Sequence, residues 1–255
     1  MNLLKTLAAA SVIALASFGA NASQITSGGV TWDPDFDNGF FSDFTSNGFF
    51  KQYYVAGTSR NGINVGDIIT DFSLVTLADT LQGYGFLTSL NGQNQGEYCV
   101  TCQLLTFTFT DFELVNLTGT GSPIFSGGSA AVYADTGGLP TDYASASDDL
   151  LWLELEAVIN PLAGDGAGST IDVAGNVTDG AFGNAYFNVI GGLVASNFDT
   201  NGQIFGSDLA YSSVRTGGTD AGTFIMNGNS IPEPTSLAIF ALGLLGLAGA
   251  ARRKA

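Results

Sequence analysis

Residues 104–110 read Leu-Leu-Thr-Phe-Thr-Phe-Thr, so threonine alternates with a large apolar residue for most of this stretch. Successive side chains of a β-strand point to opposite faces of the sheet. The alternation therefore predicts a half-buried strand with Phe107 and Phe109 pointing inward. Residues 111–115 also alternate, but in a shifted register. We therefore expect a β-bulge near Thr110 or Asp111.

The rest of the body has the same pattern of short strands and turns. Residues 151–158 predict a strand with Leu151, Leu153 and Leu155 on one face and Trp152, Glu154 and Glu156 on the other. Dipeptides rich in Gly and Asn at 61–62, 91–92, 127–128 and 227–228 are typical of tight turns. Many short strands joined by such turns predict an all-β fold. We expect a β-sandwich or jelly-roll-like body that forms a single domain over residues 23–230.

Acidic residues far outnumber basic residues in this body. The chain has a formal net charge of −16, and four of its seven basic residues, Lys5, Arg252, Arg253 and Lys254, lie in the terminal segments. Nucleic acids and anionic lipids are bound through lysine and arginine, so the composition argues against a nucleic-acid partner. It is compatible with divalent cations, neutral glycans and cationic partners. The 19 Phe and 8 Tyr supply enough apolar surface for a folded core.

The chain contains no histidine, which removes Ser-His-Asp and Cys-His catalysis and histidine-ligated zinc. An enzyme would have to rely on carboxylates, as glycoside hydrolases do. Glu154 and Glu156 lie two residues apart on one predicted strand face, with Cα atoms about 7 Å apart by strand rise. A solvated strand face opposite a leucine core explains the same pattern. We therefore expect no catalytic residues, with a carboxylate-dependent glycan hydrolase as the less favoured alternative.

Cys99 and Cys102 are the two cysteines of the chain. A redox C-x-x-C motif normally sits at a helix N-terminus in a thioredoxin-like unit, whereas this pair precedes a predicted strand. Two thiols this close join in an oxidising compartment. We expect a structural disulfide that stabilises the chain by about 2 kcal/mol, because the closed loop is short.

Asp33, Asp35 and Asp37 alternate along residues 33–39, as in the opening of an EF-hand loop. Glycine falls one position late in this stretch, and position 12 is Phe44 instead of glutamate. A true EF-hand is therefore not expected, while a simpler Ca²⁺ site at these three aspartates and an exposed Asp-rich turn are both compatible with the pattern. Calcium here, with exposed aromatic residues nearby, would allow a Ca²⁺-assisted carbohydrate-binding module.

Residues 1–22 have the three parts of a secretory signal peptide. Lys5 provides the positive charge, residues 7–18 form a short apolar region, and Ala20-Asn21-Ala22 is a small-residue cleavage site before Ser23. The apolar region is too short to span a membrane. We expect cleavage after Ala22 and export through the inner membrane.

Residues 235–251 are uncharged and mostly apolar. As a helix they would span about 26 Å, marginal for a hydrocarbon core of about 30 Å. Arg252, Arg253 and Lys254 would remain on the cytoplasmic side, which leaves the acidic body outside. We expect a single transmembrane helix that anchors the chain transiently in the inner membrane. Pro232-Glu233-Pro234 precedes this span, and its two prolines hold the backbone extended.

A Pro-Glu-Pro motif, a short span rich in Gly and Leu and a basic end follow one another over residues 231–255. In this combination the segment resembles the PEP-CTERM family of sorting signals. The resemblance implies that an exosortase, an inner-membrane cysteine protease of Gram-negative bacteria, recognises Pro232, Glu233 and Pro234. It further implies that the protease cuts near this motif and that the body is secreted to the cell surface or the extracellular polysaccharide matrix.

The sequence thus predicts an exported, exosortase-processed surface protein. Its expected role is that of a non-catalytic structural component of the exopolysaccharide matrix that contributes to biofilm cohesion, with extracellular polysaccharide as a partner. The Ca²⁺-assisted carbohydrate-binding module remains the alternative. No other cofactor is expected.

Overall fold

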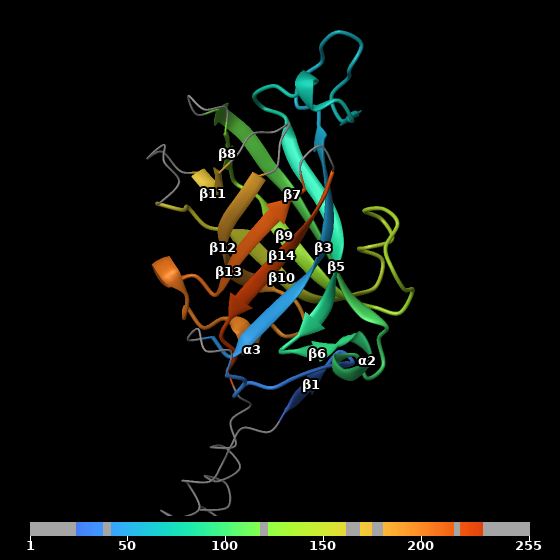
Figure 1. Ribbon diagram of the computed structural model, residues 1–255, viewed down its shortest axis with the longest axis vertical. Coiled ribbons are helices and arrows are strands. Elements are labelled where there is room, and N and C mark those ends of the chain that lie inside the picture. Colours follow the sequence, from blue (N-terminus) through green and yellow to red (C-terminus); the bar gives the residue numbers. More distant parts are fainter. Residues whose placement is uncertain are drawn as a thin grey trace, which may run out of the picture.

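The computed structural model describes residues 24–37, 42–117, 122–161, 169–174, 181–216 and 220–231. Long strands dominate these residues (Figure 1). They surround a core of buried apolar side chains. The strands that form the wall are β3 (Phe44–Val55), β5 (Thr80–Leu90), β7 (Leu104–Leu117), β9 (Ser129–Asp135), β10 (Leu150–Ala157), β12 (Ala181–Gly191), β13 (Leu209–Arg215) and β14 (Ala221–Gly228).

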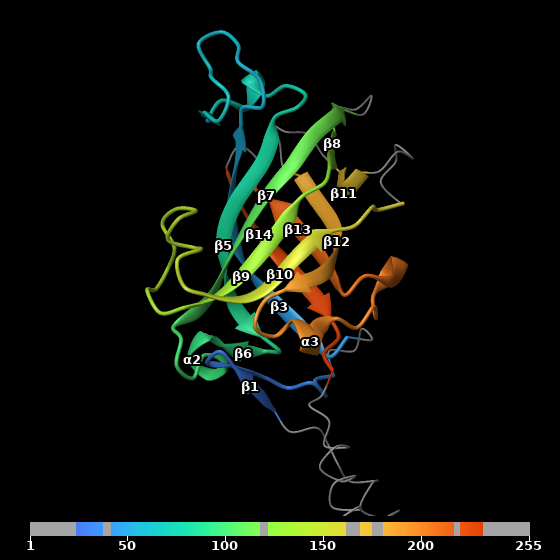
Figure 2. The ribbon, with the colours of Figure 1, turned by 180° about the vertical axis from the view of Figure 1, so that it is seen from behind.

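Within the described residues, these eight strands form a closed antiparallel barrel. They pair in the order β3-β5-β7-β9-β10-β12-β13-β14. The last strand then pairs with the first, from Gly228 opposite Phe44 to Ala221 opposite Lys51. Front and back views show the strands crossing obliquely around one axis (Figures 1 and 2). The wall is therefore an up-and-down meander with no free edge.

Two short strands extend the wall where β9 begins and β10 ends. β8 (Pro123–Ser126) pairs with the second half of β7, and β11 (Ser169–Ala174) lies between β8 and β12. Gly127 and Gly128 join β8 to β9 with φ angles of 66° and 106°. This kink lies beside a β-bulge in β7. Phe109 pairs with Gly83 of β5 and Phe112 pairs with Leu81, so β7 has one extra residue between these two pairs. Asp111, within the bulge, has a φ of 62°. The bulge predicted near Thr110 or Asp111 is confirmed.

The prediction of an all-β body is confirmed, but the predicted β-sandwich or jelly-roll arrangement is wrong. A sandwich keeps two separate sheets, whereas here β14 pairs with β3 and the sheet closes on itself. The turns expected at 61–62 and 91–92 are present, with φ angles of 43° at Asn61 and 49° at Asn91. Residues 127–128 form a kink instead of a chain reversal. The turn expected at 227–228 is wrong, because both residues pair within the sheet as the end of β14.

Phenylalanine rings packed on glycines shape the interior of the barrel. Phe107 and Phe109 of β7 lie opposite Gly85 and Gly83 of β5, and Phe50 of β3 lies opposite Gly222 of β14. A Cβ added at any of these three glycines would overlap the facing ring and a backbone carbonyl oxygen. Large rings thus occupy the space that glycine leaves, and the strands can bend tightly around them. The predicted inward orientation of Phe107 and Phe109 is confirmed.

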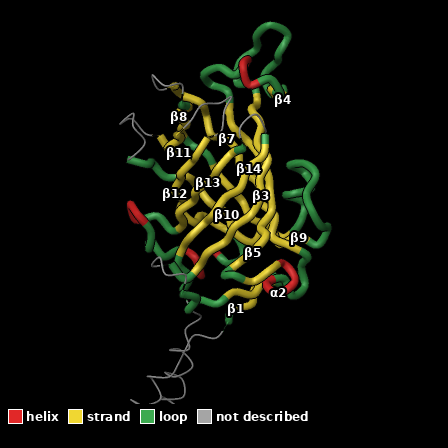
Figure 3. The backbone as a smooth tube through the Cα atoms, viewed as in Figure 1, coloured by secondary structure: helices red, strands yellow, loops and turns green. Residues whose placement is uncertain are grey.

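Aromatic side chains close one end of the barrel, here called the plugged end. β1 (Ile25–Ser27) and β2 (Val30–Trp32) form a hairpin there, next to α2 (Gln95–Tyr98) (Figure 3). The short helix α3 (Ala195–Phe198) lies at the same end (Figures 1 and 2). Trp32 is fully buried, with its ring centroid 5.5 Å from that of Trp152 and 5.4 Å from that of Phe198. Trp152 also donates a hydrogen bond from Nε1 to the carbonyl oxygen of Ser27, at 3.1 Å. These contacts hold the hairpin against the barrel wall.

The structure joins Cys99 and Cys102 in a disulfide, as predicted from the sequence. Just after α2, this turn contacts the tip of the β1–β2 hairpin. The N–H of Val100 donates to the carbonyl oxygen of Gly29 at 2.7 Å, and Cys99 forms a β-bridge with Val30. The disulfide therefore fixes a local turn that helps to dock the hairpin.

Residues 56–79 project from the opposite end of the barrel, here called the cap end, and form the extension at the top of Figure 1. This cap loop carries β4 (Ile68–Ile69) and the short 3₁₀-helix η1 (Phe72–Leu74). Asp79 is buried at its base and accepts hydrogen bonds from the N–H groups of Gly57 and Thr76, at 3.0 and 2.7 Å. Arg60 adds a two-pronged ion pair to the same carboxylate, at 3.0 and 2.5 Å.

Two smaller elements complete the described structure. β6 (Gln93–Asn94) pairs with the end of β5, and the 3₁₀-helix η2 (Ile204–Gly206) lies in the loop before β13. No helix among the described residues is long and apolar enough to cross a membrane. The predicted signal peptide at 1–22, with Ala20, Ala22 and Ser23, and the predicted span at 235–251 lie outside the described residues.

We predict that Gly85→Ala destabilises the barrel by about 2 kcal/mol, because the added methyl group would overlap the Phe107 ring and force the wall apart. Urea unfolding of the exported protein measures this change. Gly96→Ala is the matched control, since a Cβ at Gly96 in α2 meets no atom within 4 Å and alanine favours helix. Equal unfolding midpoints for the two variants would contradict the proposed ring-on-glycine packing.

A second prediction concerns the carboxylate at the base of the cap loop. Burial by itself would raise the pKa of Asp79, but the hydrogen bonds from Thr76, Arg60 and Gly57 outweigh it and lower the pKa below its usual value. The ionised carboxylate therefore stabilises the fold above about pH 4, the value for an unfolded aspartate, and this stabilisation is lost as the pH falls through the lower folded pKa.

We expect Asp79→Asn to cost about 3 kcal/mol at pH 6, since it leaves the Arg60 charge without its partner. The difference between wild type and this variant should shrink as the pH falls below about 4. Asp71→Asn, at an exposed N-cap position of the same loop, serves as the control and should leave the unfolding midpoint nearly unchanged. A difference between wild type and Asp79→Asn that does not vary with pH would show that the charge of Asp79 has no such role.

Candidate functional site

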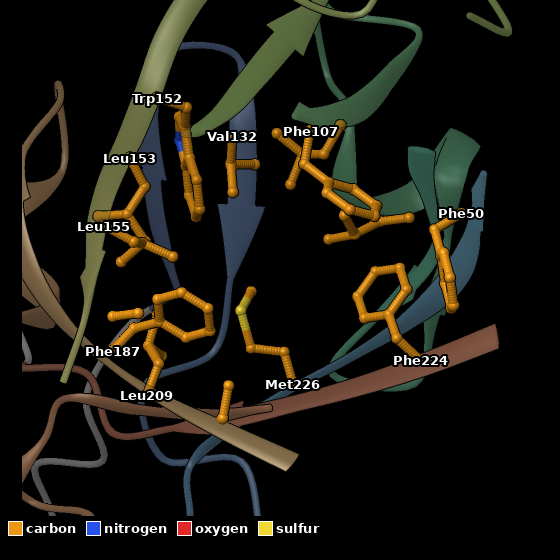
Figure 4. Packing of buried hydrophobic residues seen from close by; sticks show 14 of the residues in the cluster. Phe50, Phe107, Val132, Trp152, Leu153, Leu155, Phe187, Leu209, Phe224 and Met226 are labelled. Carbon is orange, nitrogen blue, oxygen red and sulfur yellow. The ribbon is translucent and has the colours of Figure 1, made fainter. Parts of the chain in front are cut away.

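The interior of the barrel contains a cavity of about 100 Å³. Its walls come from inward-facing residues of all eight barrel strands, and most of its lining is aromatic or aliphatic. Figure 4 shows several of these side chains, among them Phe50, Phe107, Phe187 and Phe224, pointing toward one another from different strands. An apolar space of this size accommodates a molecule about as large as one aromatic ring.

Small side chains keep this space open. Ala130 of β9, Gly183 and Ala185 of β12 and Ser213 of β13 all line the cavity, at positions where larger residues would fill it. Phe109 and Tyr211 point into the barrel as well, yet both are only half-buried. Tyr211 packs against Phe224 with ring centroids 5.6 Å apart and against Phe187 at 6.3 Å. Its remaining exposed surface therefore faces the cavity.

Polar groups gather toward the cap end of the cavity. Along β13 the inward-facing residues change from Tyr211 through Ser213 to Arg215, and Gln52 contributes from β3. Arg215 is only 4% exposed, and its guanidinium carbon lies 5.7 Å from the centroid of the Phe72 ring in the cap loop. Among the described residues that line the cavity, Arg215 is the one charged side chain. The site thus has an apolar body and a cationic end.

Burial also changes the acidity of the tyrosines at this site. It raises the pKa of Tyr54 well above its usual value, and the positive charge of Arg215 offsets only part of that effect. Burial raises the pKa of Tyr211 in the same way, against a smaller lowering effect of its hydrogen bond with Ser213. Both phenols therefore remain neutral at physiological pH, and Arg215 retains the positive charge in the cavity lining.

The predicted calcium ligands do not form a cluster. Asp33 accepts a hydrogen bond from the N–H of Asp35 at 2.9 Å, which is the geometry of an Asp-initiated turn. The described structure does not bring the carboxylate oxygens of Asp33, Asp35 and Asp37 together within 4.8 Å. Calcium binding at these residues stays a prediction.

A different acidic group was missed in the sequence. Oxygens of Asp135, Asp148 and Asp149 lie within 4.8 Å of one another. Asp135 accepts a hydrogen bond from the N–H of Gly137, and Asp149 accepts one from the N–H of Thr136 at 2.7 Å. The adjacent pair Asp148-Asp149 was visible in the sequence, but its proximity to Asp135 depends on how the loop between β9 and β10 folds back. The hydrogen bonds of Asp135 and Asp149 to backbone N–H groups show that these carboxylates stabilise the loop.

Glu154 and Glu156 lie on the outer surface of the barrel, because Leu153, Leu155 and Ala157 of β10 are buried on the opposite face. Neither glutamate lines the cavity. The predicted face of Trp152 is wrong, since a β-bulge between Leu151 and Leu153 turns this residue into the core at the plugged end. Trp32 and Tyr54 are buried too, so neither ring is exposed for stacking on a sugar.

The residues of the predicted processing signal, Pro232, Glu233, Pro234, Arg252, Arg253 and Lys254, lie outside the described residues. The last described residue before them is Ile231. Its N–H donates a hydrogen bond to the carbonyl oxygen of Asn197 in α3, at 2.7 Å. The chain therefore leaves the barrel toward the motif at the plugged end, opposite the cap loop.

Comparisons with known proteins identify this C-terminal segment alone. Residues 230–254 match the model of the PEP-CTERM protein-sorting motif. The barrel has no counterpart among the curated proteins or the solved structures that were compared. The chain therefore carries a PEP-CTERM sorting motif at its C-terminus, which implies processing by an exosortase and export to the cell surface of a Gram-negative bacterium.

Proposed function

We propose that the exported barrel is a non-catalytic binding protein that holds a small apolar molecule in its interior. The observation that carries this proposal is the cavity of about 100 Å³ inside a closed, aromatic-lined wall. Protein interiors are normally packed without voids of this size, and ligand sites are concave, mostly apolar and contain a few polar groups. The cavity between Phe109, Ala130 and Tyr211 has these properties.

The position of the sorting motif fits this role. Ile231 contacts α3 at the plugged end, so a chain tethered through the segment that follows holds the cap end away from the tether. A ligand would reach the cavity from the cap end, beneath the loop that Asp79 and Arg60 hold in place. The binding site would then face the surroundings of the cell both before and after processing.

A structural component of the exopolysaccharide matrix, with a role in biofilm cohesion, is the second candidate function. The observation in its favour is an apolar surface on the outside of the barrel, where Phe49, Phe182, Val214 and Ile225 are 51%, 58%, 44% and 48% exposed. Residues of this kind on neighbouring strands are suited to contact with another macromolecule. The Ca²⁺-assisted carbohydrate module and the glycan hydrolase have no comparable observation in their favour.

We predict that Ala130→Leu abolishes binding of a neutral aromatic probe, 3-phenylpropanol, because the larger side chain fills the cavity. The variant should unfold at a temperature equal to or above that of the wild type, since it adds buried apolar surface. Isothermal titration calorimetry on the exported protein measures the binding. Ala131→Leu is the matched control and should bind the probe like wild type. Ala131 is the next residue of β9, and since successive side chains of a strand alternate, it faces away from the cavity that Ala130 lines.

Absence of 3-phenylpropanol binding to the wild type would overturn the proposed binding function, as would equal binding to the Ala130→Leu variant. If the wild-type protein binds no probe but fractionates with the extracellular polysaccharide, the matrix role becomes the better account. In that case, polar replacements of Phe49 and Phe182 should release the protein from the matrix fraction.

A further inference from the structure

We propose that two copies of the exported barrel associate through one side of its outer wall. This side, here called the carboxylate-free face, is formed by the outward-pointing residues of β12, β13, β14 and β3, which lie side by side in Figure 1. The inference goes beyond the proposed binding function, because it does not involve the cavity. It follows from the charge of this face, from an apolar row that crosses it and from the symmetry of that row.

The first step is the distribution of charge around the barrel. Within their bounds, the described strands β12, β13, β14 and β3 contain no aspartate or glutamate, and Lys51 is the one charged residue that points outward from them. The strands on the other side, which lie in front in Figure 2, carry Glu113, Glu154 and Glu156 on their outer surface. In a chain with a net charge of −16, two copies repel each other in most orientations. The carboxylate-free face is where they approach with the least repulsion.

The second step is a row of apolar side chains that crosses this face. Backbone pairing places Val214 beside Phe182 on one side and beside Thr223 on the other. Thr223 in turn lies beside Phe49. The two phenylalanines and Val214 are each about half exposed, as is Ile225 two residues along β14. A second apolar surface packed on this row would remove these side chains from water, which favours association.

The extent of the face is sufficient for such a contact. Four adjacent strands span about 19 Å, and the seven residues of β13 span about 23 Å along the strand. A surface of this extent with protruding rings exposes roughly 600 Å², which is the lower end of the range that each partner buries in a specific interface. We therefore expect a dimer with a dissociation constant in the micromolar range.

The third step is the symmetry of the row, which favours a second copy as the partner. Its two phenylalanines lie at opposite ends, with Val214 and Thr223 between them. A two-fold axis that runs along the strands between β13 and β14 would set Phe49 of one copy opposite Phe182 of the other. The face is therefore complementary to itself, as a two-fold interface requires. The same axis turns both plugged ends to one side, where Ile231 leaves each barrel, so both copies can be tethered to the same surface.

Analytical ultracentrifugation of the exported protein tests this proposal. We expect wild type to sediment as a dimer at about 100 μM, a concentration well above micromolar dissociation constants. Val214→Glu should weaken the dimer at least a hundredfold, because it places a carboxylate inside the contact. Val115→Glu is the matched control, since Val115 is an exposed valine of β7, outside the face, and the substitution adds the same charge. It should leave the dimer intact. Phe182→Ser adds no charge and should weaken the dimer at least tenfold.

Ionic strength supplies a second readout. The two copies carry like charges, so added salt screens their repulsion without weakening the apolar contact. We expect the dissociation constant of the dimer to fall severalfold between about 50 and 500 mM sodium chloride. A dissociation constant that rises with salt would show that ion pairs hold the copies together elsewhere, and it would overturn the proposal.

Three further results would contradict the assignment of this face. The first is a wild type that stays monomeric at the same concentration. The second is equal weakening by Val214→Glu and Val115→Glu. The third is a monomer that extracellular polysaccharide retains and that Val214→Glu releases, since the face would then bind a glycan. None of these results bears on the cavity, which binding of 3-phenylpropanol tests separately.

Discussion

The packing of phenylalanine rings against glycine backbone inside the barrel is the constraint on which the rest of the structure depends. The rings of Phe50, Phe107 and Phe109 each lie against a glycine of the neighbouring strand. Any larger residue at these glycines would place a Cβ atom that overlaps the ring. Because these glycines carry no Cβ, the strands can approach the rings and curve enough for β14 to reach β3. The same arrangement leaves the interior incompletely filled, so fold and candidate binding site have one physical origin.

The ends of the barrel are determined by buried carboxylates and aromatic contacts. The carboxylate of Asp79 accepts hydrogen bonds from Arg60 and from two backbone N–H groups, and these bonds hold the base of the cap loop together. At the plugged end, Asp208 accepts hydrogen bonds from the N–H groups of Val189, Thr200 and Asn201, at 2.8, 2.7 and 2.6 Å. Part of the acidic character of this protein is thus structural, since aspartate oxygens satisfy loop N–H groups that would otherwise be buried without partners. The remaining carboxylates, such as Glu156, lie on the surface.

Local patterns in the sequence predicted the local structure well. The alternation over residues 104–110, the shift of register at Asp111 and the close spacing of Cys99 and Cys102 each depend on neighbouring residues, and each prediction is confirmed. Closure of the sheet was not predictable in this way. It depends on the pairing of Phe50 with Gly222, and these two residues are far apart in the sequence. Arg215 was missed for the same reason, since only the assembled barrel places it beside Phe72 and the cavity. Pairing of β14 with β3 likewise turned an expected Asn-Gly turn into strand.

We propose that the interior of this exported barrel, aromatic and apolar for most of its length, is a small binding chamber. This proposal requires a closed wall around an apolar space, and diffraction from crystals of the exported protein under xenon pressure tests that requirement most directly, since xenon enters dry apolar cavities. We predict xenon density inside the barrel, bounded by Phe109, Ala130 and Tyr211, with β14 paired to β3. A fully packed interior without xenon, or a wall left open between β14 and β3, would contradict it.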